Sequence, residues 1–232
     1  PNTEEYVFSR LAPTPVARER FLGDCLKSAL ITGAKQYAAF GSGMDISAYE
    51  NKGLNVFEID RAAVISDKKR RLRAAGIEPG ENVHFICGDL ARDNILDLLE
   101  RNGFKKGEKT VFSCLGLLYY MTAEQISRLF SAISAFAAEG SEVIFDFADG
   151  HLFSASEPRV KDMLKMAEAS GEPMKSCFGY NELEKLLEGC GFLIYEFLNT
   201  DETNQRYFSD EKYLKAFEHI CLCRAVLKKK YK

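Results

Sequence analysis

Short apolar runs alternate with segments of helical periodicity along most of this chain. The runs predict seven strands, at Gln36–Phe40, Leu54–Ile59, Asn82–Cys87, Thr110–Cys114, Glu142–Phe147, Phe192–Leu198 and His219–Leu227. Helices that follow the early strands after short connections predict a parallel α/β sheet. The last two strands are joined by a different, longer connection, which predicts a closing hairpin. The predicted fold class is therefore a Rossmann-like, doubly wound, seven-stranded and mostly parallel sheet with an antiparallel C-terminal strand.

Apolar residues at spacings of three and four mark the helices, and capping or breaking residues mark their ends. The predicted helices are a first one with Arg18 and Arg20 in its first turn and Gly33 after its end, a short one after Gly43, one capped by Asp60 that ends at Gly76, one through Ile95–Leu99, one with a Thr122–Gln125 capping box, one opened by Pro158, one capped by Asn181 and a short one from Ser209.

The pattern divides the chain into an arm and one domain. Residues 1–15 have little periodicity and are expected to form an N-terminal arm. Residues 16–232 fit a single domain of ordinary size. The alternation of strands and helices changes after Asp149, so residues 148–180 are expected to form a substrate-side insertion or lid.

Composition and charge narrow the function further. The net charge of −3 and the pI near 5.8 give no general attraction to nucleic acid. No run of 18 apolar residues and no N-terminal signal pattern occur, which predicts a soluble, cytoplasmic protein without a membrane partner. The seven cysteines are an odd number and lie mostly in apolar runs, so they are expected to be reduced and buried. The three histidines are scattered, and Cys221 and Cys223 have poor zinc spacing, so no metal site is expected.

A glycine turn follows the first predicted strand. Gly41, Ser42 and Gly43 stand where glycine permits positive φ and a close approach of a ligand to the backbone. Asp60 ends the second strand, nineteen residues after Gly41, where an acidic side chain can accept hydrogen bonds from both ribose hydroxyls. Ile46 replaces the third glycine of a dinucleotide fingerprint, which disfavours a diphosphate ligand. The pattern predicts a nucleoside site; the alternative is a turn in which glycine serves geometry only.

Other candidates lie near later strand ends and in helices. Asp89 and Leu90 follow the third strand and could read the edge of an adenine, or Asp89 could cap the next helix. Arg18 could hold a ligand carboxylate or lie in a solvated first turn. The basic run 68–73 is expected to be a solvated helix face, because no aromatic residues interleave it as in nucleic-acid sites. The carboxyl ends of parallel strands share one edge, where we expect the glycine turn, Asp60, Asp89, Leu115 and the loop after Phe147 to meet.

Several motifs together resemble a known family. They are Ala17-Arg18, FGSGMDISAY at 40–49, VFEID at 56–60, GDL at 88–90, GLLYYMT at 116–122 and, more loosely, HICLCRA at 219–225. In order and sequence they resemble a class I S-adenosylmethionine-dependent methyltransferase. More narrowly, they resemble the leucine carboxyl methyltransferase family, which includes polyketide O-methyltransferases. The resemblance covers residues 16–147 well and the C-terminal third loosely.

The resemblance implies S-adenosylmethionine as the cofactor and S-adenosylhomocysteine as its product. Arg18 would hold the methionine carboxylate, Asp60 the ribose hydroxyls, and Asp89 with Leu90 the adenine. The complete implied cofactor-binding set is Arg18, Gly41, Ser42, Gly43, Asp45, Asp60, Asp89, Leu90 and Leu115, with the two glycines letting the amino-acid part of the cofactor pass the turn.

The chain departs from the family pattern in a few places. The family usually has Glu at the position of Leu115, placed to meet the amino group of the cofactor. Glu50 or Asn51 stands about where the family often has Arg. The chain is also expected to lack most of the N-terminal region that covers the pocket in longer members, so either residues 150–180 or another subunit would cover it.

The expected function is O-methylation of a carboxylate on a small molecule. A carboxylate with a pKa of about 4 is already ionised at neutral pH, whereas a phenol with a pKa of about 10 needs a general base. His151 would supply that base, or it is an ordinary loop histidine. Tyr119 and Tyr120 would line the transfer pocket, or they only pack. The alternatives are methylation of a protein C-terminal carboxylate and a family member that binds the cofactor or a partner without turnover.

Other enzyme classes fit the sequence less well. No N/D-P-P-Y motif follows the fourth strand, which argues against methylation of adenine amino groups. No proline precedes Cys114, which argues against cytosine C5 methylation. Ile46 and the closing strands disfavour a nicotinamide dehydrogenase. The sequence predicts no particular oligomeric state.

Overall fold

Seven strands form one mixed sheet in a computed structural model that describes residues 12–49, 51, 53–90, 92–211 and 214–228. Their order across the sheet is β3-β2-β1-β4-β5-β7-β6. The first five strands run parallel, and β7 is antiparallel to both β5 and β6. The fold class predicted from the sequence is confirmed. The strands are β1 (Gln36–Phe40), β2 (Asn55–Asp60), β3 (Val83–Cys87), β4 (Thr110–Cys114), β5 (Glu142–Ala148), β6 (Phe192–Leu198) and β7 (Ile220–Leu227).

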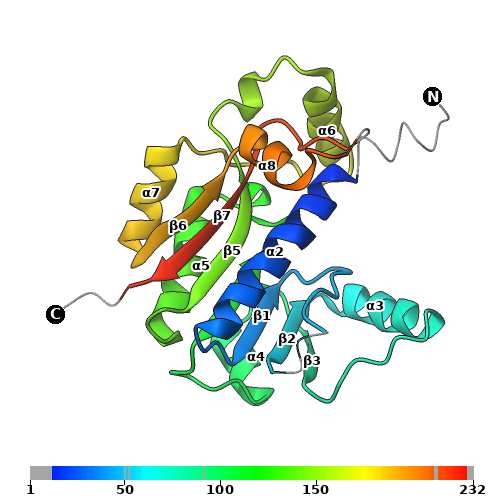
Figure 1. Ribbon diagram of the computed structural model, residues 1–232, viewed down its shortest axis with the longest axis vertical. Coiled ribbons are helices and arrows are strands. Elements are labelled where there is room, and N and C mark those ends of the chain that lie inside the picture. Colours follow the sequence, from blue (N-terminus) through cyan, green and yellow to red (C-terminus); the bar gives the residue numbers. More distant parts are fainter. Residues whose placement is uncertain (1–11, 50, 52, 91, 212–213, 229–232) are drawn as a thin grey trace.

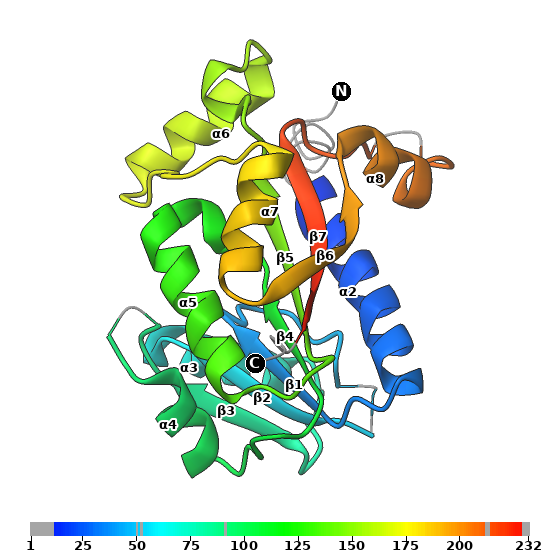
Figure 2. The same cartoon turned by 90° about the vertical axis from the view of Figure 1, so that its left-hand side faces the viewer.

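Helices cover both faces of this sheet. In Figure 1, α2 crosses in front of the strands, and the turned view of Figure 2 shows α4, α5 and α7 on the other side. The α6 helix lies beyond the sheet at the top of Figure 1. The helices are α2 (Pro13–Ile31), α3 (Ala62–Ala74), α4 (Ile95–Arg101), α5 (Ala123–Phe136), α6 (Pro158–Ala169), α7 (Tyr180–Gly189) and α8 (Thr200–Tyr207), with short 3-10 helices η1 (Leu118–Tyr120) and η2 (Leu152–Ser154).

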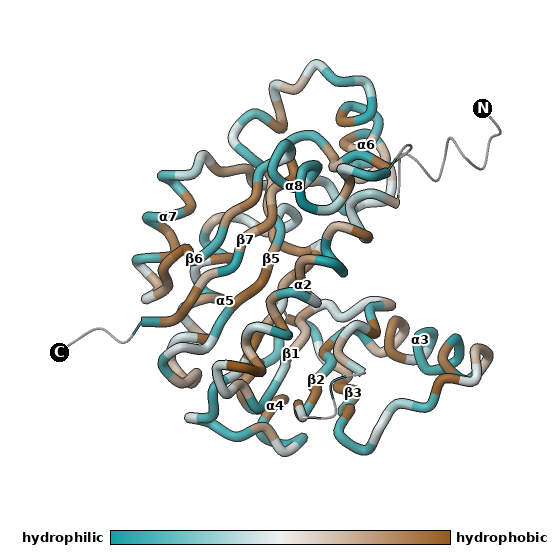
Figure 3. The backbone as a smooth tube through the Cα atoms, in the orientation of Figure 1, coloured by the Kyte–Doolittle hydropathy of each residue, from teal (hydrophilic) through white to brown (hydrophobic). Residues whose placement is uncertain are grey.

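The core has two layers, because alternate residues of each strand point to opposite faces. Phe40, Phe57 and Phe112 join a cluster with residues of α4, α5 and α7. Tyr37 and Val111 join a second cluster with residues of α2. Since both faces are buried, the central strands carry continuous apolar runs, which are brown in Figure 3. This is why hydrophobic runs alone predicted the strands to within one residue at most of their ends.

The predicted short helix after Gly43 is wrong. The described residues between β1 and β2 form turns. Asp45 Oδ1 accepts hydrogen bonds from the backbone N–H of Ser47 at 2.8 Å and from its hydroxyl at 2.5 Å. Such local side-chain bonds compete with helical ones, and Gly41 and Gly43 add positive φ angles of 69° and 49°.

Some predicted helix boundaries also need correction. The N-cap residue of α3 is Arg61, so Asp60 does not cap that helix. The α7 helix begins at Tyr180, one residue before the predicted cap Asn181. The short helix expected from Ser209 is wrong, because α8 precedes that position.

The start of the first helix also differs from the expectation. It begins at Pro13, inside the segment 1–15 expected to form an arm. Arg18 and Arg20 therefore lie beyond its first turn. Residues 1–11 fall outside the described part of the chain.

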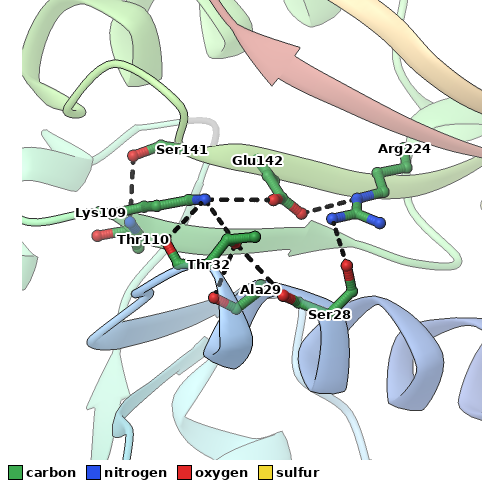
Figure 4. Close-up of polar contacts among 8 residues, drawn as sticks. All are labelled: Ser28, Ala29, Thr32, Lys109, Thr110, Ser141, Glu142 and Arg224. Atoms are coloured by element: carbon green, nitrogen blue, oxygen red, sulfur yellow. Dashed lines mark hydrogen bonds and ion pairs between the residues drawn. The ribbon is translucent and has the colours of Figure 1, made fainter.

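A buried polar cluster fastens the C-terminal end of α2 to the sheet (Figure 4). Glu142 of β5 accepts a 2.8 Å hydrogen bond from Arg224 Nε of β7, and both side chains are buried. Arg224 Nη2 donates to Ser28 Oγ of α2 at 3.3 Å. Lys109 Nζ donates to Thr32 Oγ1 at 2.7 Å and lies 3.8 Å from the Glu142 carboxylate. Because a buried carboxylate needs cationic partners, the cluster fixes where α2 ends on the sheet.

The substitution Glu142→Gln should destabilise the fold strongly, because it leaves Arg224 buried without its carboxylate. We expect the free energy of unfolding to fall by about 3–5 kcal/mol, the range for removing one partner of a buried ion pair. Glu124→Gln is the matched control, because Glu124 pairs with Arg128 on the exposed side of α5, where such a pair contributes at most about 1 kcal/mol. Urea denaturation followed by circular dichroism measures both variants. Equal losses in the two would contradict a structural role for the cluster.

The cysteines are mostly buried, as expected. All seven are free, and burial is confirmed for Cys25, Cys114, Cys190, Cys221 and Cys223. Cys177 is half-buried, and Cys87 is exposed at the end of β3, contrary to the expectation. Burial is the largest influence on the buried thiols, and it raises the pKa of Cys25 and Cys221 to about 12.

In the folded protein, Cys87 should therefore react first with iodoacetamide and Cys177 more slowly. The reactive species is the thiolate, and a thiol pKa near 12 lowers its population at pH 8 by roughly three orders of magnitude relative to an ordinary cysteine. The five buried cysteines should react only after denaturation. Time-resolved mass spectrometry of the alkylated peptides measures this order. Rapid labelling of Cys25 or Cys221 under native conditions would show that these sites open more readily than their burial implies.

Candidate functional site

The glycine turn and Asp60 come together at the carboxyl edge of the parallel strands. Gly41 N–H donates to the carbonyl of Ile59 at 2.9 Å, which ties the turn to the end of β2. Gly43 N–H donates to Asp60 Oδ2 at 2.9 Å, and Arg61 N–H donates to Asp60 Oδ1 at 2.7 Å. Two backbone donors thus orient the carboxylate, and each oxygen keeps further acceptor capacity.

The turn contains an unsatisfied polar atom. Ser42 is buried, and within the described residues its Oγ has no hydrogen-bond partner. Buried hydroxyls normally have partners, so this atom is available to a ligand or water. Asp45 differs, because its Oδ1 is used within the turn by Ser47.

A buried ion pair supports the turn from below. Lys68 of α3 lies 2.6 Å from Glu58 of β2, and both side chains are almost completely buried. Lys68 Nζ also donates to the backbone carbonyl of Asp45 at 2.5 Å. Burial raises the pKa of Glu58, and Lys68 partly offsets this rise. The expectation that the whole basic run 68–73 is solvated is therefore wrong at Lys68, whose spacing from Leu72 places it on the inward side of the helix.

Asp89 lies beyond the end of β3 and does not cap the next helix. The N-cap of α4 is Asn94, whose side chain accepts from Leu96 N–H at 3.1 Å. Asp89 N–H donates to Asp93 Oδ2 at 2.7 Å. The helix-capping alternative for Asp89 is thus wrong, and Leu90 beside it packs against the main core cluster.

Arg18 reaches from α2 to the end of β5. Its Nε donates to Asp146 Oδ2 at 2.8 Å, its Nη2 lies 2.7 Å from the same oxygen, and its Nη2 also donates to the Tyr119 hydroxyl. Asp146 Oδ1 accepts from Gly116 N–H at 2.6 Å, so both carboxylate oxygens are occupied. Burial alone would lower the pKa of Arg18, but Asp146 and Tyr119 raise it overall, and the guanidinium stays charged. The alternative that Arg18 is a solvated surface residue is wrong.

Asp146 was missed in the sequence analysis. It lies within an apolar strand, where a single acid gives no periodic signal, and its partner Arg18 is 128 residues away. The apolar surroundings themselves could have flagged it, because a carboxylate is rarely buried without a cation. Leu115, which precedes Gly116, is half-buried and packs toward the α2 cluster.

The two predicted tyrosines form the short helix η1. Their rings meet edge to face, with centroids 4.8 Å apart. Burial and the nearby Asp146 raise the pKa of Tyr119, and burial also raises that of Tyr120. The segment after α6 closes over η1, because Lys175 N–H donates to the Tyr119 carbonyl at 2.6 Å and Ser176 Oγ donates to the Leu118 carbonyl at 3.2 Å.

His151 lies beside a second histidine that the sequence analysis did not select. The ring centroids of His151 and His219 are 6.4 Å apart. His219 Nδ1 lies 3.0 Å from both carboxylate oxygens of Asp149, and its Nε2 lies 3.6 Å from Glu157 Oε2. His219 also has a positive φ of 62°, which is uncommon outside glycine. No local motif marks this pairing, because β7 brings His219 next to Asp149 across the sheet.

Two searches of the described residues bear on metal and membrane association. No group of three or more His, Cys, Asp or Glu side chains in the described segments is arranged to hold a metal ion. None of the helices in the described part of the chain is both long enough and apolar enough to span a bilayer.

Known proteins share this arrangement. The sequence profile described as leucine carboxyl methyltransferase matches residues 1–134. YktD of Bacillus subtilis (strain 168), assigned by its name to the S-adenosyl-L-methionine-dependent methyltransferases, is 43% identical over 226 residues, which are 94% of this chain and 74% of that protein.

Two solved structures have the same fold at low sequence identity. A DUF574 family protein from Streptomyces avermitilis has a TM-score of 0.68 at 14% identity, over 94% of this chain and 83% of that one. Magnesium protoporphyrin IX methyltransferase from Synechocystis PCC 6803, with bound S-adenosylhomocysteine, has a TM-score of 0.58 at 16% identity, over 94% and 86% of the two chains. The profile match and the identity to YktD decide the family: this chain belongs to the leucine carboxyl methyltransferase family of S-adenosylmethionine-dependent methyltransferases.

Proposed function

We propose that this protein transfers the methyl group of S-adenosylmethionine to an oxygen, and that the acceptor is a carboxylate of a small molecule. The acceptor side carries the argument, because the tyrosines there are poor bases. The alternatives are a protein C-terminal carboxylate as the acceptor and cofactor binding without turnover.

The residues at the carboxyl edge fit the cofactor on three observations. Ser42 Oγ is a buried hydroxyl that has no partner among the described residues. The Asp60 carboxylate is oriented by two backbone N–H groups and can still accept ribose hydroxyls. Gly116 leaves a space beside Arg18, since a Cβ there would lie 3.0 Å from Arg18 Nη1.

We assign the parts of the cofactor to residues accordingly. Asp60 binds the ribose, Asp89 and Leu90 lie at the adenine, and Arg18 meets the methionine carboxylate. Gly41, Ser42 and Gly43 let the cofactor pass close to the backbone, with Asp45 and Leu115 at the margins of the site. When bound, the cofactor supplies an electrophilic methyl group on a sulfonium.

The acceptor is the part of the proposal that depends on acid–base chemistry. Tyr119 and Tyr120 have raised pKa values, so neither hydroxyl is a base at neutral pH. The Nε2 of His219 faces Glu157 rather than open space. A carboxylate acceptor needs no base, only positioning for an in-line displacement. A hydroxyl acceptor would depend on His151, the exposed histidine in the loop after β5.

We also propose that residues 148–180 form the acceptor-side lid. This segment bonds to η1 through Lys175 and Ser176 and to the end of β5, where Phe178 N–H donates to the Ala148 carbonyl at 2.9 Å. It contributes Leu152, Val160 and Met174 to a separate small hydrophobic cluster that also contains Tyr119. Lids of this kind exclude water from the transfer site.

Binding of S-adenosylhomocysteine to the purified protein should be micromolar, about −8 kcal/mol, by calorimetric titration. Asp60→Ala should weaken it at least tenfold, because charge-assisted hydrogen bonds to the ribose contribute about 1.5–3 kcal/mol. Asp67→Ala is the matched control, since Asp67 is an acid on the exposed side of α3 that pairs only with Arg70 and Arg71 in the described structure. NAD should not bind. Absence of heat with S-adenosylhomocysteine and S-adenosylmethionine would refute the cofactor assignment.

Carboxylate methylation should give a base-labile product. After incubation of the enzyme with tritiated S-adenosylmethionine and a cell extract fraction below 3 kDa, treatment at high pH should release volatile tritiated methanol, because esters hydrolyse and ethers do not. Label that stays non-volatile would indicate a hydroxyl or nitrogen acceptor. Volatile label found only with the protein fraction would favour the protein C-terminal alternative.

A further inference from the structure

We propose that Asp146 and Tyr119 are positioning residues that hold Arg18 against the amino-acid end of the cofactor. Together the three residues form a subsite selective for a zwitterionic amino-acid group. This inference rests on the proposed function, and it adds residues from β5 and η1 to a site otherwise built from β1, β2 and α2.

The first observation is the way Arg18 is held. Two of its nitrogens, Nε and Nη2, meet the same oxygen of Asp146 at 2.8 and 2.7 Å. The other oxygen of Asp146 is occupied by Gly116 N–H. The carboxylate is therefore fixed by the backbone of the β4 loop, and it in turn fixes the plane of the guanidinium.

The second observation is the Tyr119 hydroxyl. It accepts a hydrogen bond from Arg18 Nη2 and so limits rotation of the guanidinium from the other side. Its raised pKa keeps the hydroxyl protonated at neutral pH, so it remains able to donate as well. The Tyr119 ring is buried, and its backbone carbonyl is bonded to Lys175 N–H, which makes it a rigid support.

The third observation is the nitrogen that remains. Within the described residues, Arg18 Nη1 has no hydrogen-bond partner, while Nε and Nη2 are both used. Gly116 has no side chain on this side, and a Cβ there would come within 3.0 Å of Nη1. The Arg18 side chain keeps 21% of its surface exposed although its partner Asp146 is fully buried. The held guanidinium thus presents one edge outward.

The charges complete the argument. An arginine edge binds a carboxylate well, and a guanidinium that is already oriented loses less entropy on binding. The free amino acid also carries an ammonium group, which requires negative charge nearby. β4 is followed by the apolar Leu115, so in this part of the site Asp146 supplies that charge. A neighbouring cation and anion match a zwitterion and disfavour ligands that carry only one of the two charges.

Three ligands test the subsite by calorimetric titration. S-adenosylhomocysteine carries the whole zwitterion, decarboxylated S-adenosylmethionine carries only the ammonium, and 5′-methylthioadenosine carries neither. In the unmodified protein we expect S-adenosylhomocysteine to bind at least tenfold more tightly than either of the others. Asp146→Asn should weaken S-adenosylhomocysteine at least tenfold and change 5′-methylthioadenosine by less than twofold.

A milder variant keeps the test informative if Asp146→Asn does not fold. Tyr119→Phe keeps the buried ring and removes only the hydroxyl, and it should weaken S-adenosylhomocysteine about threefold without changing 5′-methylthioadenosine. Glu124→Gln, an exposed substitution on α5, should change neither affinity.

The outcomes separate this inference from the proposed function. Equal weakening of both ligands by Asp146→Asn and no selective effect of Tyr119→Phe would mean that these residues only stabilise the fold. Equal affinity of the unmodified protein for S-adenosylhomocysteine and 5′-methylthioadenosine would overturn the subsite while leaving the nucleoside site intact. Failure to bind any of the three ligands would instead overturn the cofactor assignment itself.

Discussion

Two buried carboxylates on β5 determine how α2 lies against the sheet. Asp146 and Glu142 are four residues apart, so both side chains point to the α2 face, with Ile144 between them. Arg18 meets Asp146 near the start of α2, and the cluster around Glu142 holds the end of the same helix. Apolar packing alone would let a helix slide or rotate, whereas a buried charge that loses its partner costs several kcal/mol. The two carboxylates therefore restrict α2 to one position, and that position carries Arg18 to the cofactor edge.

Most of the sheet was predictable because its physics is local. A strand buried on both faces needs an unbroken apolar run, and five such runs separated by helices leave few topologies open. Where local signals compete, the prediction failed. Between β1 and β2, the Asp45 side chain bonds to Ser47 and replaces the expected helix with turns. The α8 helix was missed although Asn199 and Glu202 form a capping box, because its sequence is polar and lacks an apolar stripe.

The site was predictable only where a motif carries it. The glycine turn and Asp60 lie close in sequence and were placed correctly at the strand ends, and the structure joins Gly43 to Asp60 directly. Asp146 and His219 carry no such local signal, because each acquires its partner through long-range strand pairing or helix packing. Lys68 is the reverse case, because its basic neighbours suggested a solvent-facing side chain. Its burial depends on Glu58, an acid inside a strand, and a one-dimensional pattern cannot reveal that pairing.

Tyr119 connects the two halves of the proposed reaction. Its hydroxyl bonds to Arg18 on the cofactor side, and its backbone carbonyl bonds to Lys175 in the segment that we propose as the lid. A ligand that holds Arg18 in place also reduces the freedom of this tyrosine, so less entropy remains to be lost when the lid closes. The coupling is reciprocal, since a closed lid fixes Tyr119 and hence Arg18 before the cofactor binds. Cofactor and acceptor would then bind with positive cooperativity through one rigid residue, without any large movement of the sheet.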